Sequence, residues 1–294
     1  MFHKFGEEEK LICREKLINK LKNQVNIIRQ DIIKMICQAG KGHPGGSFSA
    51  AEIVTALYFT VLNINPDNPE WPARDRFILS KGHACPVWYT ALAHRGFFDK
   101  KHLSTLREID SILQGHPDMT KTPGVDMNTG SLGNGLSIGL GMVLSSLNQG
   151  YDYDVYVMLG DGEIQEGMVW EAAMSAGNYN LDNLYAIVDY NGLQNDGYIK
   201  DINNLEPIVD KWKAFNWNVK EINGHSFEEI LNGFEWAQKV KGPVVLIAHT
   251  IKGKGVSYME NICEWHGKTP DEKEKKQAFS ELEKRGENNG NNGH

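Results

Sequence analysis

The sequence predicts a three-layer α/β/α fold in which helices cover both faces of a mostly parallel sheet. Two short apolar runs, 155–159 and 184–188, flank a segment with helical periodicity, which is the pattern of a strand–helix–strand unit. Further strands are predicted at 76–80, 217–222 and 244–249. Strands that alternate with helices indicate a parallel sheet, and such a sheet is buried on both faces.

Composition limits the class of protein. The 294 residues are 40% hydrophobic and 23% charged, as in a water-soluble globular protein. The net charge of −7 argues against nucleic-acid or membrane-surface partners, and no apolar run approaches the roughly 18 residues of a membrane span. The four cysteines are far apart and form no CxxC pair, which disfavours zinc or disulfides and favours a cytoplasmic location. One domain is expected over 11–280, after an extension (1–10) and before a disordered polar tail (281–294).

The predicted helices begin with a long amphipathic one over 11–39, stopped by Gly40 and Gly42. A second helix is expected over 49–62, with Ser49 as N-cap and Glu52 completing a capping box. Others follow at 87–96, 135–147 and 168–178. The loop 115–135, rich in glycine and proline, is too long for a passive connection and predicts a functional segment.

Oxygen-bearing side chains follow two predicted strands. Asp161 lies between two glycines after the run 155–159, and Asn191 follows the run 184–188 thirty residues later. Because the carboxyl ends of parallel strands meet at one edge of a sheet, we expect both side chains to lie together there. With the backbone carbonyl of Leu193 they suit Mg²⁺, with Ca²⁺ or Mn²⁺ as alternatives, and such a cation can clamp a diphosphate. The N–H of Gly162, at a helix start, is expected to face the phosphate.

The segment 160–197 resembles the thiamine-diphosphate signature of transketolases, and its Gln-Glu-Gly at 165–167 favours that family over related enzymes. Five other segments resemble transketolase motifs in family order. They are Gly-His-Pro-Gly-Gly at 42–46, Ser-Lys-Gly-His-Ala at 80–84, Gly-His-Pro at 115–117, Thr-Gly-Ser-Leu-Gly-Asn-Gly at 129–135 and Trp-His-Gly at 265–267. The resemblance implies a thiamine-diphosphate-binding fold over nearly the whole chain.

The resemblance also assigns roles to four histidines. His43, His83 and His116 are implied to surround the reactive carbon and the donor hydroxyls, whereas His83 and His266 are implied to lie near the diphosphate. The reaction moves protons on and off sugar hydroxyls, and imidazole titrates near neutrality, so all four remain candidates for the base.

Further site residues follow from the same resemblance. The loop 129–135 is implied to lie against the aminopyrimidine ring, and Glu166 to join a carboxylate network that links two active sites across a subunit interface. An acidic residue in the first turn of a helix also stabilises the helix dipole, so a structural role for Glu166 stays open. The other implied cofactor-binding residues are Gly130, Ser131, Leu132, Gly162, Glu163 and Asn191.

The resemblance covers only the first part of a transketolase, which is normally about twice as long. The family's catalytic glutamate and most arginines that grip the sugar phosphate belong to the absent part. We therefore expect a complete short gene product that acts as the N-terminal subunit of a split transketolase. A second chain with the pyrimidine-binding and C-terminal domains would complete an α2β2 heterotetramer, which transfers a two-carbon ketol unit from a ketose phosphate to an aldose phosphate.

Other interpretations stay open. The chain could belong to a different thiamine-diphosphate enzyme, such as a 2-oxo-acid dehydrogenase or a specialised ketol transferase, or be a non-catalytic binding homologue. A nucleotide-binding protein is disfavoured, because the chain has no Gly-x-x-x-x-Gly-Lys-Ser/Thr motif.

Overall fold

The computed structural model describes the backbone of residues 7–290, in which five strands form one parallel sheet. The strand order is β1-β2-β3-β5-β4, and every neighbouring pair is parallel. The strands are β1 (Arg76–Leu79), β2 (Val155–Gly160), β3 (Leu184–Tyr190), β4 (Asn218–Asn223) and β5 (Val244–His249). Each predicted strand is therefore present to within two residues at either end, and the prediction of a parallel sheet is confirmed.

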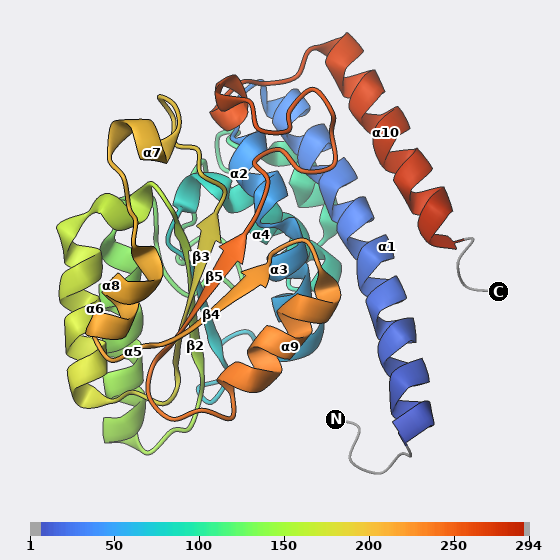
Figure 1. The fold of residues 1–294 in the computed structure, drawn as a ribbon. Helices are drawn as coiled ribbons and strands as arrows, with labels where there is room; N and C mark the ends of the chain where they lie inside the picture. The colour runs from blue at the N-terminus through green and yellow to red at the C-terminus, as the bar shows by residue number, and fades with distance from the viewer. Residues whose placement is uncertain (1–6, 291–294) are drawn as a thin grey trace.

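Helices cover both faces of the sheet (Figure 1). One face carries α5 (Asn134–Gln149), α6 (Gly167–Tyr179) and α8 (Ile208–Ala214). The other carries α1 (Glu7–Ala39), α3 (Ala51–Ala56), α4 (Cys85–Arg95) and α9 (Phe227–Ala237), and α10 (Glu272–Gly290) packs along α1. The short helices are α2 (Pro44–Ser49), α7 (Ile199–Ile202), η1 (Leu57–Val61), η2 (Gly82–Ala84), η3 (Lys100–Thr105), η4 (Glu163–Gln165) and η5 (Cys263–His266). Within the described range, no helix has the length and apolar character that a membrane crossing requires.

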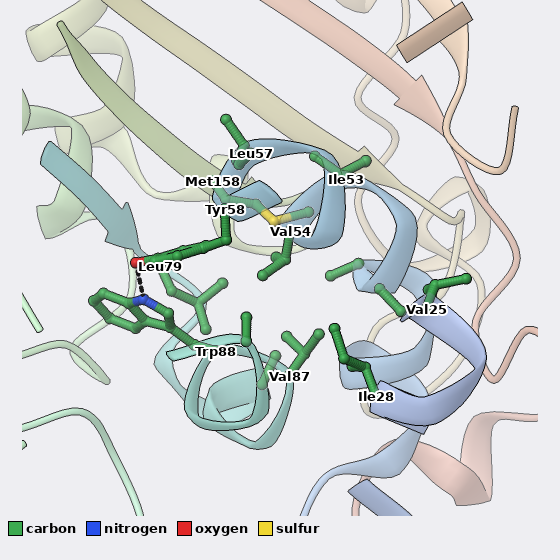
Figure 2. Close-up of a cluster of buried hydrophobic side chains, with 14 of the residues drawn as sticks. Val25, Ile28, Ile53, Val54, Leu57, Tyr58, Leu79, Val87, Trp88 and Met158 are labelled. Atoms are coloured by element: carbon green, nitrogen blue, oxygen red, sulfur yellow. Dashed lines mark hydrogen bonds between the residues drawn. The ribbon is translucent and has the colours of Figure 1, made fainter. Parts of the chain in front are cut away.

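Two hydrophobic cores follow from the two-residue repeat of the strands. In β2, Val155 and Val157 belong to the core under α5 and α6, whereas Tyr156 and Met158 belong to the core under α1, α3 and α4. Figure 2 shows part of this second core, where the indole N–H of Trp88 donates a hydrogen bond to the Tyr58 hydroxyl. Burial on both faces explains why these strands are continuously apolar in the sequence.

The register of the sheet sets the position of the predicted metal ligands. Gly160 of β2 pairs with Asp189 of β3. Asp161 and Asn191 follow these residues, so they leave neighbouring strands at the same edge, as the sequence predicts.

The predicted helix over 49–62 is wrong in its start. The chain is already helical from Pro44, whose ring presets φ for a first turn, and Ser49 is the last residue of α2 rather than an N-cap. Its hydroxyl instead donates to the Asp189 carboxylate at 2.5 Å, and Glu52 binds Arg29 instead of closing a capping box. Both side chains have tertiary partners that a local pattern does not contain.

The chain ends also differ from prediction. The α1 helix begins at Glu7, and α10 continues to Gly290, so residues 7–10 and 281–290 are helical rather than extension and tail. Ala278 and Leu282, one turn apart, are fully buried, and α10 packs on α1, which stabilises a segment whose composition is polar. Residues 1–6 and 291–294 lie outside the described residues.

Candidate functional site

A cavity of about 290 Å³ opens at the carboxyl ends of β2 and β3. This is where ligands bind in open parallel sheets. The cavity is lined by Gly46, Lys81, His83, Leu132, Gly160, Asp161, Gly162, Glu163, Gln165, Glu166, Asn191, Leu193, Gln194, Asn195, Lys252 and His266. Most of the predicted site residues are therefore brought together by the fold from segments far apart in the sequence.

The predicted metal ligands Asp161, Asn191 and Leu193 all line this cavity. The Asp161 carboxylate accepts hydrogen bonds from the N–H groups of Gly162 (2.8 Å) and Gly192 (2.6 Å), which orient it. Burial, followed by the nearby Asp189 carboxylate, raises the pKa of Asp161 to about 7. The Gly162 N–H thus donates to Asp161 in the structure, and its contact with a phosphate stays a prediction.

The donor set suits a hard cation. Among the described side chains, those of residues 11–286, no three His, Cys, Asp or Glu cluster as a metal site. A cation at this edge would therefore rely on one carboxylate together with amide and backbone oxygens, the set that Mg²⁺ and Ca²⁺ accept. A cation would also favour the ionised form of Asp161.

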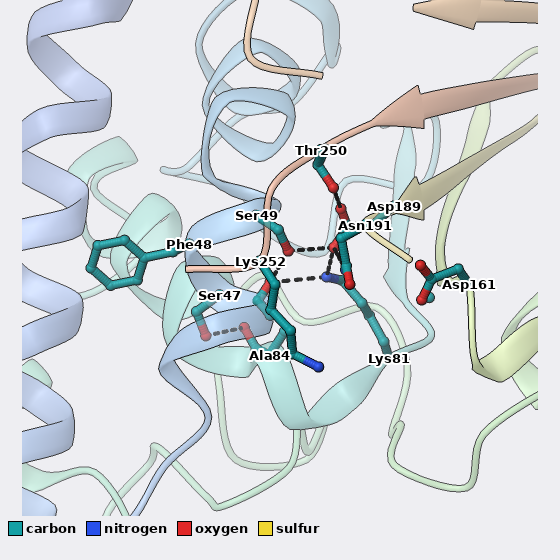
Figure 3. A network of polar contacts seen from close by, with 12 residues as sticks. Ser47, Phe48, Ser49, Lys81, Ala84, Asp161, Asp189, Asn191, Thr250 and Lys252 are labelled. Carbon is teal, nitrogen blue, oxygen red and sulfur yellow. Dashed lines mark hydrogen bonds and ion pairs between the residues drawn. The ribbon is translucent and has the colours of Figure 1, made fainter. Parts of the chain in front are cut away.

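Beneath the cavity lies Asp189, which is fully buried. Figure 3 shows the side chains of Ser49, Lys81, Asn191 and Thr250 converging on its carboxylate. Burial alone would raise the pKa of Asp189, but the Lys81 ammonium together with the hydrogen bonds from Ser49 and Thr250 lowers it. Asp189 therefore stays ionised and ties α2, β3 and β5 together below the site.

Lys252 is a site residue that was not predicted from the sequence. It is only 2% exposed, and its ammonium donates to the carbonyl oxygen of Leu193 at 3.0 Å and lies 2.9 Å from Nδ1 of His266. Burial lowers its pKa to about 8. A signal was available, because this lysine stands in Thr-Ile-Lys-Gly directly after β5, at the sheet edge where the other ligands lie.

Three of the predicted histidines form a cluster. The ring centroids of His43, His83 and His266 lie 5.2, 5.5 and 5.0 Å apart in pairs. Burial, assisted by the positive charges of nearby lysines and Arg107, lowers the pKa of His43 to about 4 and of His266 to about 3, and that of His83 well below its usual value. These imidazoles are therefore neutral at pH 7 and can each donate one hydrogen bond and accept another.

His43 and His116 do not line the cavity itself. Nδ1 of His43 is buried with no hydrogen-bond partner among the described residues. His116 is exposed and lies against Gly130, where φ is +129° and a Cβ atom would come within 2.9 Å of the imidazole. Only glycine permits this contact between the loop 115–117 and the loop 129–135.

Glu163 holds the loop 129–135 in place. Its buried carboxylate accepts hydrogen bonds from the Ser80 hydroxyl and from the N–H groups of Gly133 and Gly160, both at 2.9 Å. These donors contact both oxygens, so Glu163 supports the loop. Glu163 also lines the cavity, and its direct contact with a cofactor stays a prediction. Leu132 of this loop also lines the cavity, whereas Gly130 and Ser131 do not.

Glu166 lies at the edge of the cavity and is exposed. A Cβ atom on Gly133 would come within 2.8 Å of its Cβ, so its stem packs on the loop 129–135. Its carboxylate has no hydrogen bond to another described residue that would indicate a structural role.

Comparison with known proteins decides the family. The family model described as "Transketolase, thiamine diphosphate binding domain" matches residues 20–286. The chain belongs to the transketolase family. This domain is the N-terminal, cofactor-binding part of a transketolase, as the sequence motifs predict.

Two kinds of transketolase are similar to this chain. It is 46% identical to a 6-deoxy-6-sulfo-D-fructose transketolase subunit of a Clostridium species, over 90% of this chain and 97% of the relative. It is 43% identical to an apulose-4-phosphate transketolase subunit of Phocaeicola vulgatus, over 87% of this chain and 92% of the relative. Against the human transketolase, 40% identity covers 85% of this chain but only 40% of the relative. The chain thus corresponds in extent to the N-terminal subunit of a split transketolase.

The fold agrees with this assignment. The transketolase of Campylobacter jejuni superposes with a TM-score of 0.85 and 32% identity, over 90% of this chain and 42% of that one. The three-layer transketolase fold predicted from the motifs is confirmed.

Proposed function

We propose that this chain binds Mg²⁺ and thiamine diphosphate as the N-terminal subunit of a two-chain transketolase. The observation that carries the proposal is the convergence of Asp161, Asn191, the Leu193 carbonyl and Lys252 on one cavity that two histidines also line. Oxygen ligands for a cation lie there beside donors for an anion, which is the arrangement that a metal-bound diphosphate requires.

Different residues of the cavity would bind the metal and the diphosphate. Asp161, Asn191 and the Leu193 carbonyl would hold the metal, and Lys252, His83 and His266 would hold the diphosphate oxygens. Gly130, Ser131 and Leu132 would fix the aminopyrimidine through the loop that Glu163 supports. When bound, thiamine diphosphate supplies the carbon nucleophile and the electron sink for carbon–carbon bond cleavage.

His43 and His116 would face the sugar hydroxyls. Support comes from their position beside the cavity and from the unpartnered Nδ1 of His43, an acceptor or donor free for a substrate hydroxyl. A low pKa keeps His43 neutral and able to accept a proton. Glu166, exposed at the cavity edge, would meet a neighbouring subunit.

A second chain would complete the site. The separate subunits that resemble this chain match it over nearly their whole length, whereas single-chain transketolases are matched over about 40%. We propose an α2β2 assembly in the cytoplasm, in which the partner supplies the pyrimidine-binding and C-terminal domains and most of the grip on sugar phosphates.

A specialised ketol transferase is the second candidate. The two split-subunit relatives are called transketolases of sulfofructose and of apulose 4-phosphate, so ketol transfer within this family is not limited to the common pentose phosphates.

The test is an assay of ketol transfer with purified chain, thiamine diphosphate and Mg²⁺, with and without a polypeptide that matches the remaining part of single-chain transketolases. We expect turnover only with both chains. Turnover by this chain alone would contradict the two-chain arrangement, and release of CO₂ from pyruvate by the complex would identify a 2-oxo-acid dehydrogenase. Absence of thiamine diphosphate binding under all conditions would contradict the proposed function as a whole.

A further inference from the structure

A continuous hydrogen-bonded chain runs from the core behind the sheet to the segment that carries Lys252. The buried guanidinium of Arg29 on α1 binds both oxygens of Glu52 on α3, at 2.8 and 2.7 Å. The same carboxylate lies 3.0 Å from Nδ1 of His225, in the turn between β4 and α9. Nε2 of His225 then accepts the backbone N–H of Ile251 at 2.8 Å.

These contacts determine the tautomer of His225. Since Nε2 accepts a hydrogen bond from a backbone N–H, it carries a lone pair and no proton. The proton of the neutral ring is therefore on Nδ1, which donates to Glu52. Arg29 keeps Glu52 ionised, so the carboxylate accepts this bond and holds the ring in the one orientation that reaches Ile251.

The residue after Ile251 is Lys252. Backbone hydrogen bonds hold this segment on either side, from the Thr250 N–H to the Tyr190 carbonyl and from the Lys254 N–H to the Ile251 carbonyl, both at 3.1 Å. The Ile251 N–H is bound to His225, the Lys252 carbonyl accepts the N–H of Asn261 at 2.9 Å, and the Gly253 N–H donates to the Gly45 carbonyl at 3.1 Å. His225 does not line the cavity, and its side chain contacts this segment through the hydrogen bond from the Ile251 N–H.

We infer that His225 is a positioning residue for cofactor binding, which holds the Ile251 amide and thereby aims the Lys252 ammonium at the diphosphate end of the cavity. The inference rests on the proposed function, because it takes the anionic ligand of Lys252 to be thiamine diphosphate. Arg29 and Glu52 support this role of His225, because they keep the imidazole proton on Nδ1.

Two isosteric substitutions separate positioning from a structural role. In His225→Asn the amide NH₂ replaces Nδ1–H and still donates to Glu52, but nothing accepts the Ile251 N–H. In His225→Gln the longer side chain places its amide oxygen near the position of Nε2, where it accepts the Ile251 N–H, and the contact with Glu52 is lost. His94→Asn is the matched control, because His94 also pairs with a carboxylate (Asp31, 2.8 Å) but lies away from the cavity.

The first readout needs no cofactor. Amide hydrogen exchange at Ile251, measured on the full-length chain, should be at least about tenfold faster in His225→Asn than in the wild type. It should stay near the wild-type rate in His225→Gln and His94→Asn. Equal protection in His225→Asn and the wild type would overturn the inference, whatever the ligand.

The second readout is the affinity for thiamine diphosphate with Mg²⁺, measured by calorimetry on the full chain bound to its partner. His225→Asn should weaken binding about tenfold, and His225→Gln should restore most of it. A loss of thermal stability in His225→Gln with unchanged affinity in His225→Asn would identify a purely structural residue and refute the inference. If the wild-type assembly itself bound no thiamine diphosphate, the proposed function would fail, and the exchange measurement would still decide the role of His225.

Discussion

The ammonium Nζ of Lys252 lies 2.9 Å from Nδ1 of His266, and both side chains line the cavity at the carboxyl edge of the sheet. An ammonium can only donate, so Nδ1 of His266 accepts and the imidazole proton is on Nε2. The pair therefore presents a positive charge and a ring N–H to the same space, which makes it suited to an anionic ligand.

Replacing this positive charge should weaken diphosphate binding. We expect Lys252→Gln to reduce the affinity for thiamine diphosphate about 30-fold, because removing one partner of a buried charged contact costs roughly 2 kcal/mol or more. Calorimetric titration in the presence of Mg²⁺ measures the change. Lys254→Gln on the same segment is the control, since Lys254 is absent from the cavity lining, and an equal loss in both variants would contradict a local role for Lys252.

The metal assignment can be tested at its single carboxylate. Asp161→Asn keeps the size of the side chain but removes the charge, and the Mg²⁺-dependent part of thiamine diphosphate affinity should fall at least about 100-fold, more than for residues that only orient a ligand. Removing Mg²⁺ with a chelator should weaken the wild type in the same way and change the variant little. Asp196→Asn, an exposed carboxylate on the neighbouring loop, should behave as the wild type. Full Mg²⁺ dependence in Asp161→Asn would refute the assignment.

Glu163 should matter for stability and for the loop 129–135. A glutamine there places an NH₂ group toward N–H donors, so Glu163→Gln should lower the free energy of unfolding by about 1–3 kcal/mol. Urea denaturation measures this change, and faster proteolysis of the loop would show that its support is lost. Glu171→Gln on the exposed surface of α6 should leave both unchanged. A stable variant with a protected loop would mean that Glu163 does not hold it.

The buried pair Arg29–Glu52 predicts a pH dependence of stability. Burial alone would raise the pKa of Glu52, but Arg29 and His225 outweigh burial and lower it from 4.5 to about 2. A carboxyl whose pKa is lower in the folded state stabilises that state above its unfolded pKa. Its contribution, about 3 kcal/mol, is present above pH 4.5 and is lost as the pH falls toward 2.

The corresponding measurement is urea unfolding of the wild type and Glu52→Gln between pH 7 and pH 3. The difference in unfolding free energy should be largest near neutral pH and should shrink below pH 4.5. Glu283→Gln, an exposed change on α10, should stay within about 0.5 kcal/mol of the wild type throughout. A difference between wild type and Glu52→Gln that does not vary with pH would exclude linkage through Glu52.

The strands and the ligand edge could be predicted because they depend on local pattern. Val155 to Leu159 form a continuous apolar run, and the spacing from Asp161 to Asn191 matches one strand–helix–strand unit, so their meeting at one edge follows from parallel pairing. The glycine-flanked histidines could be assigned only through resemblance to a family, because spacing alone does not place loops in space.

Partners that lie elsewhere in the sequence cannot be predicted from local pattern, as Ser49, Glu52 and Lys252 show. Ser49 and Glu52 stand three residues apart, which suggests a capping box, yet they bind Asp189 and Arg29, which lie 140 and 23 residues away. Lys252 stands between Ile251 and Gly253, and its ammonium reaches the carbonyl of Leu193, 59 residues away. The α10 helix is not predicted for a related reason, since Ala278 and Leu282 become buried only when α10 packs on other parts of the fold, α1 among them.

By itself, the sequence determined the five strands, the helices α1, α4, α5 and α6, the edge of the sheet where ligands gather and, through its motifs, the transketolase family. Those properties depend on side-chain periodicity and on short segments whose chemistry is local. Only the tertiary structure decided which charges face one another: that Asp189 is neutralised by Lys81 beneath the site, that Glu163 supports a loop, and that Lys252 reaches the Leu193 carbonyl. The physical reason is that a buried charge needs a partner, and the packing of the fold decides which residue lies close enough to be that partner. The spacing of residues along the chain does not give the distance between the two side chains in space.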